Sequence, residues 1–194
     1  MPLPADLPVV DHHCHLSPHG EGIEAARRFA RAGGTHLFLA TQNYAGRPPT
    51  TVADYRTQFE TTEALAARVR ADAGVIVYPV IAPYPVDLVT VAPTLGLAAA
   101  LGLHTAALDL AGRWVREGRA VALGEVGLPH FDVPTDVRAA CDRAFDHALR
   151  VAHDVGCPAV VHSADLDAAG YADLAERARR AGLSPDRVVK HYAR

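Results

Sequence analysis

Two histidines lie two residues apart, directly after a short apolar stretch near the start of the chain. His13 and His15 follow Val9 and Val10, with Cys14 between them. Side chains of an extended strand alternate between its two sides, so His13 and His15 share one side and Cys14 lies on the other. Two imidazoles in this arrangement can bind one metal ion. An isolated His-x-His is more often structural, so the interpretation depends on whether further ligands follow other strands.

Three further candidate ligands stand at the ends of later apolar stretches. Glu125 ends the stretch that begins at residue 119, His162 ends the one that begins at 157, and His191 ends the one that begins at 187. The carboxyl ends of parallel strands meet at one rim, so these side chains would come together with His13 and His15. Imidazole and carboxylate groups suit zinc, iron, nickel and related divalent ions. Five ligands exceed the three that a catalytic zinc takes from protein, so two ions bridged by the carboxylate fit better.

Strand-like and helix-like segments alternate along the whole chain. Apolar patterning predicts strands at 9–16, 35–41, 74–81, 119–127, 157–163 and 187–192, and helices at 23–31, 52–73, 104–117, 135–154 and 165–181, with a short helix and a loop in the proline-punctuated segment 82–102. Such alternation is typical of parallel βαβ units in an α/β fold. Six units fit either an open doubly wound sheet or an incomplete (β/α)8 TIM barrel. The polar residues at the ends of four strands favour the barrel, because barrel active sites assemble there.

The composition limits the class of protein. The chain has 194 residues, 49% of them hydrophobic, which suits one domain with a substantial core. Its formal charge of −3 provides no general attraction for nucleic acid, although a local basic groove would still be compatible with it. Residues 1–6 lack the basic and apolar regions of a signal peptide, and no apolar run is long enough to span a bilayer. We therefore predict a soluble, cytoplasmic protein without a membrane partner.

The ordered motifs resemble the TatD family of metal-dependent hydrolases, in the amidohydrolase superfamily. The motifs that carry this resemblance are Asp11-His12-His13-Cys14-His15-Leu16, Leu123-Gly124-Glu125-Val126-Gly127-Leu128, Val160-Val161-His162-Ser163 and the strand-ending His191. Together they extend over almost the whole chain. A closer resemblance is to the archaeal TatD-related hydrolases, which share the His-x-His-Leu-Ser-Pro opening and a Lys-His-Tyr-type sixth strand.

The resemblance implies that His13 and His15 bind one metal ion, that His162 and His191 bind a second, and that Glu125 bridges them. It implies a hydrolase in which metal-activated water cleaves a phosphodiester, including DNA, or an amide or ester bond. The expected cofactors are two divalent ions, with zinc first and manganese, iron, nickel or magnesium as alternatives. The expected substrate is a small molecule or a nucleic acid, and a homo-oligomer is one option for assembly.

The sequence also departs from the family pattern. In the family a further Asp, after the eighth strand, binds metal and acts as the general base, and this sequence ends before a seventh strand. We therefore expect a single barrel domain, residues 1–194, that is shorter at its C-terminus than the family and lacks the general base. Pro129 stands where TatD nucleases have Asp, and Ala164 stands where they have an Arg suited to phosphate. His130, on the predicted rim, is a candidate substrate contact.

Two alternatives to the TatD-like hydrolase remain open. The chain could be a non-catalytic metal-binding protein, or an inactive fragment, because it lacks the general-base Asp. Phosphoesterases of the polymerase-and-histidinol-phosphatase type also begin with His-x-His on a first strand. The Gly-Glu-Val-Gly sequence at 124–127 and the position of His162 favour the TatD-like hydrolase over these phosphoesterases.

Overall fold

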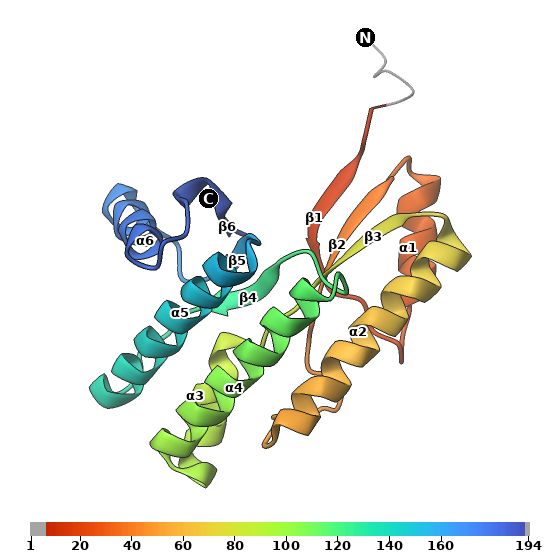
Figure 1. Ribbon diagram of the computed structural model, residues 1–194. Helices are drawn as coiled ribbons and strands as arrows, with labels where there is room; N and C mark the ends of the chain where they lie inside the picture. The colour runs from red at the N-terminus through yellow and green to blue at the C-terminus, as the bar shows by residue number, and fades with distance from the viewer. Residues whose placement is uncertain (1–6, 193–194) are drawn as a thin grey trace.

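The computed structural model describes residues 7–192 and contains two parallel three-stranded sheets that follow one another along an arc (Figure 1). The first sheet has the order β1 (Val10–Cys14), β2 (His36–Ala40) and β3 (Ile76–Val80), and the second has the order β4 (Leu123–Gly127), β5 (Ala159–His162) and β6 (Val188–Lys190). An isolated parallel bridge between Val80 and Ala122 joins β3 to β4. Strands that neighbour in sequence therefore also neighbour in space, and the α/β fold is a partial barrel, as predicted.

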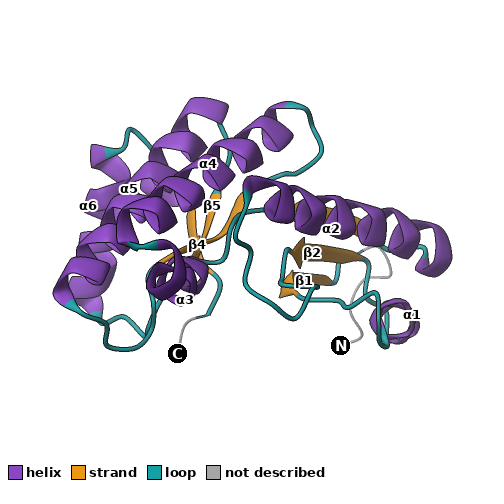
Figure 2. Ribbon diagram, turned by 90° about the horizontal axis from the view of Figure 1, so that it is seen from below, coloured by secondary structure: helices purple, strands orange, loops and turns teal. Residues whose placement is uncertain are grey.

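The helices lie outside the strands (Figure 2). They are α1 (Gly22–Arg31), α2 (Val52–Ala73), α3 (Pro85–Leu95), α4 (Leu97–Arg116), α5 (Thr135–Val155) and α6 (Ala168–Arg180), followed by a short 3-10 helix, Pro185–Arg187. Residue alternation in β2 explains how the layers form. Leu37 and Leu39 pack with α2 residues in one buried cluster, whereas Phe38 packs on the inner side against Val80 and Val160.

Helix α2 has the residues predicted for it because both of its ends carry strong local signals. The Thr51 side chain accepts a hydrogen bond from the backbone N–H of Asp54, whose carboxylate accepts one from the backbone N–H of Thr51 in return. Gly74 ends the helix with a left-handed conformation, φ +68°. The helix places Tyr55 and Phe59 in the main core.

The predicted boundaries were wrong in the segment between β3 and β4. Residues 82–102 contain the whole of α3 and the first part of α4, and α4 begins at Leu97 instead of residue 104. Gly96 separates the two helices with φ +81°, and Pro93 lies inside α3. Helix α6 likewise begins at Ala168, after Asp167 caps it through the N–H of Gly170, and not at residue 165.

Within residues 7–192, no helix combines the length and the hydropathy that a membrane crossing requires. The predicted lack of a signal peptide concerns residues 1–6, which lie outside the described residues. The cytoplasmic location and the homo-oligomer stay predictions of the sequence.

Candidate metal centre

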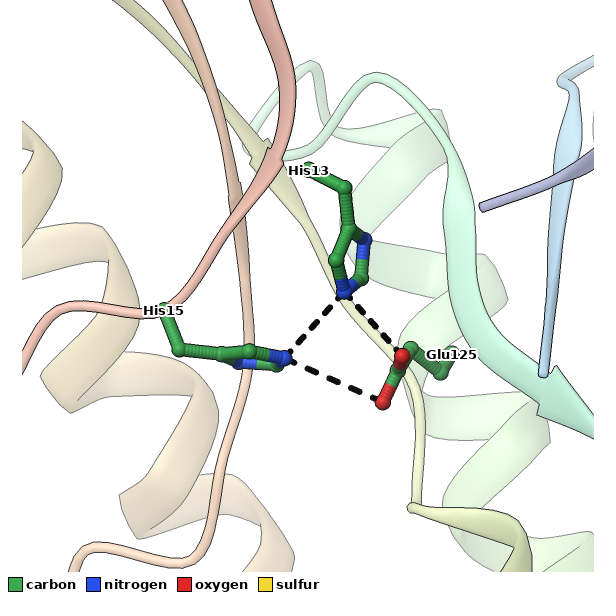
Figure 3. Close-up of side chains that lie close together, drawn as sticks. All are labelled: His13, His15 and Glu125. Atoms are coloured by element: carbon green, nitrogen blue, oxygen red, sulfur yellow. Dashed lines mark hydrogen bonds and ion pairs between the residues drawn. The ribbon is translucent and has the colours of Figure 1, made fainter. Parts of the chain in front are cut away.

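The first group of candidate ligands joins β1 and its C-terminal end to β4 (Figure 3). The Nε2 atom of His13 lies 3.1 Å from Oε1 of Glu125 and 3.2 Å from Nε2 of His15. The Nε2 atom of His15 lies 3.9 Å from Oε2 of Glu125. Two nitrogen ligands of a tetrahedral zinc ion are roughly 3.3 Å apart, given zinc–nitrogen bonds of about 2 Å. The two imidazoles are therefore spaced like ligands of one ion.

The second group combines the same carboxylate with the two histidines at the C-terminal ends of β5 and β6. The Nε2 atom of His191 lies 2.9 Å from Oε1 of Glu125, and Nδ1 of His162 lies 3.7 Å from that oxygen. The Nδ1 atom of His162 and the Nε2 atom of His191 are 3.1 Å apart. In each group the potential ligand atoms all lie within 4.8 Å of one another. The five residues that the sequence singled out as ligands thus come together, with Glu125 common to both groups.

The charge state of these groups suits metal binding. Burial raises the pKa of Glu125, but the neighbouring His13, His162 and His191 outweigh this effect and hold the pKa well below its usual range. Burial lowers the pKa of His191 to about 4 and also lowers that of His15. Near neutral pH an ionised Glu125 carboxylate therefore faces the neutral rings of His15 and His191, as metal ligation requires.

Hydrogen bonds with neighbouring groups hold the first pair of histidines in place. The Nδ1 atom of His15 lies 3.2 Å from the carbonyl oxygen of Ala40, at the end of β2. A proton donated there leaves Nε2 of His15 free for a metal ion. The carboxylate of Asp11 accepts a hydrogen bond from the backbone N–H of His13 at 3.1 Å, so it orders the end of β1.

Cys14 packs in the cluster beneath α1 and α2, where burial raises its thiol pKa to about 12.

The candidate ligands open into a cavity of about 580 Å³. Besides the five ligands, the cavity is lined by polar side chains that follow β2 and β3: Thr41, Gln42, Asn43, Tyr84 and Asp87. None of these five residues was predicted from the sequence. The position of Thr41, Gln42 and Asn43 directly after β2 was a signal that could have found these three, because strand ends in a barrel face the same rim.

Among the described residues that line the cavity, Asp87 carries the one carboxyl group outside the candidate ligands. Its side chain is buried, and its Oδ2 atom accepts a hydrogen bond from the Tyr55 hydroxyl at 3.1 Å. Burial raises the pKa of Asp87 to about 6, and the hydrogen bonds from Tyr55 and the Tyr84 backbone offset only part of that effect. Asp87 thus brings an acidic group with a raised pKa to the cavity.

His130 lies in the loop after β4, as predicted, and its ring contacts a candidate ligand. Its Nδ1 atom is 3.0 Å from Nε2 of His162. The Tyr84 hydroxyl is 3.3 Å from the same nitrogen. The substrate contact predicted for His130 stays a prediction.

Comparisons with known proteins show the family of this chain. The family described as TatD related DNase matches residues 10–194. The chain belongs to this family. An uncharacterized protein of Methanocaldococcus jannaschii is 28% identical over 189 residues, which are 96% of this chain and 65% of that protein. The TatD family chain thus spans about two thirds of the length of this relative.

Two solved structures share the fold of this TatD family member. A TatD-like protein from Archaeoglobus fulgidus aligns with a TM-score of 0.59 and 16% identity, over 92% of this chain and 66% of its own. The TatD homologue YJJV of Escherichia coli aligns with a TM-score of 0.56 and 22% identity, over 90% of this chain and 56% of its own. These likenesses confirm the predicted barrel-type fold, and the family match over residues 10–194 confirms the predicted resemblance to the TatD family.

Proposed function

We propose that this chain supplies the metal centre of a TatD-type metal-dependent hydrolase with two divalent ions. In this proposal His13 and His15 hold one ion, and Glu125 bridges it to a second held by the pair that follows β5 and β6, His162 and His191. The observation that supports it most directly is the position of the Glu125 carboxylate, which faces both histidine pairs within hydrogen-bond or ion-pair distance.

The donor set fits such ions, and zinc, manganese, iron, nickel and magnesium are the candidates. When bound, two ions of this kind supply Lewis acidity and lower the pKa of water. The residues of the chain have the remaining tasks. Glu125 stays ionised and orients both histidine pairs, Ala40 fixes the tautomer of His15, and the cavity walls hold the substrate next to the ligands. The proposal assigns no general base to the described residues.

The bond that is cleaved is a phosphodiester in the first form of this proposal, because the family is described as DNases. A second form, the hydrolysis of an amide or ester, is favoured by the cavity lining. Among the described residues that line the cavity there is no Lys or Arg, and Asp87 adds a carboxyl group. A polyanionic substrate is held best by cationic side chains, whereas a neutral one does not need them.

The test combines metal content with turnover. Purified protein is stripped with a chelator and reloaded with zinc or manganese. It is then assayed on bis(p-nitrophenyl) phosphate, DNA, p-nitrophenyl acetate, a lactone and an anilide. We expect metal-stimulated turnover that His162→Ala abolishes and that the exposed control His19→Ala preserves. Bound metal without turnover on any substrate would favour the non-catalytic metal-binding protein, and protein that binds no metal would contradict the site.

A further inference from the structure

The two ring nitrogens of His162 face different partners. Its Nδ1 atom faces the carboxylate of Glu125 at 3.7 Å and Nε2 of His191 at 3.1 Å. Its Nε2 atom faces the other way, toward Nδ1 of His130 at 3.0 Å and the Tyr84 hydroxyl at 3.3 Å. Nδ1 of His162 is therefore the nitrogen that could ligate an ion beside Glu125. Nε2 is the nitrogen through which a hydrogen bond to a neighbour can fix the ring.

This geometry sets the tautomer that metal binding needs. A neutral imidazole carries one proton, and the ligating nitrogen must be the one without it. The proton of His162 must therefore be on Nε2, where an acceptor has to receive it. The Nδ1 lone pair of His130 is the nearer of the two acceptors. When His130 accepts this hydrogen bond, its own proton is on its Nε2 atom.

The ring of His130 is itself held at the rim. It packs edge-on against Phe131, with ring centroids 5.3 Å apart and an interplanar angle of 89°. It also meets the His162 ring at 67°, with centroids 5.2 Å apart. The loop that carries His130 begins directly after Gly127, the last residue of β4, so one short segment connects Glu125 to the neighbour of His162.

We propose that His130 is a positioning residue, which accepts the Nε2 proton of His162 and so keeps the Nδ1 lone pair of His162 directed at the metal site beside Glu125. The inference rests on the proposed metal centre and adds to it a residue outside the ligand set. Partners that fix the tautomer of a ligating histidine typically change metal affinity by roughly 10- to 100-fold when they are removed.

The first measurement uses metal-free protein in excess chelator at pH 8. Long-range ¹H–¹⁵N spectra of histidine rings distinguish the two tautomers of His162. We expect the Nε2–H tautomer in the wild type and in His130→Gln, whose amide oxygen can still accept the proton. His130→Phe keeps a ring but has no acceptor, so we expect a mixture of tautomers. An unchanged His162 tautomer in His130→Phe would overturn the proposal.

The second measurement is zinc affinity by competition with a chelating dye, with circular dichroism as the check on folding. We expect His130→Phe to bind zinc about 10- to 100-fold more weakly than the wild type does. The zinc affinity of His130→Gln should stay within about threefold of the wild type. Tyr84→Phe removes the other neighbour of Nε2 and should have the smaller effect. A loss in Tyr84→Phe that His130→Phe does not show would assign the role to Tyr84 and overturn the proposal. A wild type that binds no zinc would contradict the proposed function, whereas the tautomer spectra would still decide the role of His130.

Discussion

Gly127 lies directly against the backbone carbonyl of His162. A Cβ atom at position 127 would be 2.1 Å from that oxygen, and Gly127 has φ +137°, where side chains are strained. The N–H of the next residue, Leu128, donates to the same carbonyl at 3.0 Å. The ends of β4 and β5 are therefore held together next to the candidate ligands, and this contact sets the distance between Glu125 and His162.

We expect Gly127→Ala to weaken metal binding although it changes no ligand. The added methyl group must push β4 away from β5, and we expect a loss of about 3 kcal/mol or more in the free energy of unfolding. Gly118→Ala is the matched control, because Gly118 has φ +73° and no atom within 4 Å of its added Cβ. It should cost only about 1–2 kcal/mol and leave zinc affinity unchanged. Urea unfolding and dye competition measure both quantities, and wild-type values for Gly127→Ala would refute the role of this contact.

The shared carboxylate predicts unequal effects on metal stoichiometry. Glu125→Ala removes a ligand from both groups, so we expect it to reduce the content of both ions. His15→Ala removes a ligand from one group, so we expect it to reduce the content by at most one ion. Plasma emission spectrometry of protein reloaded with zinc measures the stoichiometry. Glu60→Ala, an exposed change on α2, is the control. Equal losses in Glu125→Ala and His15→Ala would argue against a bridging carboxylate.

The candidate ligands could be predicted from the sequence because each lies on a strand or within one residue of its C-terminal end. Strand periodicity is local, and the rule that parallel strand ends meet at one rim turns it into a spatial prediction. Asp87 and Tyr84 could not be predicted in this way. They lie on and beside α3, in a segment whose prolines and glycines hide its helices, and the burial of Asp87 depends on Tyr55, 32 residues away.

The contact between His130 and His162 shows the same limit. The sequence places His130 in the loop after β4, but the direction of its ring is set by Phe131 and by the neighbouring strand. The start of α4 was missed for a related reason. Its first turns pack with α3 and α5 in a buried cluster that includes Ala100, and this packing offsets the low helix propensity of Gly102 inside the helix.

The raised pKa of Asp87 predicts a change of stability with pH. Because its folded pKa of about 6 lies above the ordinary value of 3.8, ionisation costs the folded state free energy. The cost is absent below about pH 4 and complete above about pH 6. Asp87→Asn keeps an acceptor for Tyr55 and carries no charge. Its stability relative to the wild type should therefore rise by about 3 kcal/mol between pH 4 and pH 8. Urea unfolding in chelator measures this difference, and a difference that does not change with pH would contradict the assigned burial of the charge.

The buried ring of His104, on α4, predicts a change of stability with pH in the opposite direction. Its ring is buried, and its Nδ1 atom has no hydrogen-bond partner among the described residues. Burial and the nearby His147 lower its pKa to about 4 from 6.5, so the stability that its neutral form allows is complete above about pH 6.5 and is lost as pH falls toward 4.

We expect His104→Leu to remove this acid sensitivity. Leu is similar in size to His and leaves no unpaired polar atom. The free energy of unfolding of the variant at pH 7 should therefore be within about 1 kcal/mol of the wild-type value. Near pH 4 the variant should be the more stable by about 3 kcal/mol, because the wild type must then protonate a buried ring. Urea unfolding in chelator at several pH values measures the difference. The same change at the exposed His19 should give a curve parallel to that of the wild type. The other histidines are common to both proteins, so only the difference between the two curves reports on His104. Parallel curves for His104→Leu and the wild type would contradict the prediction.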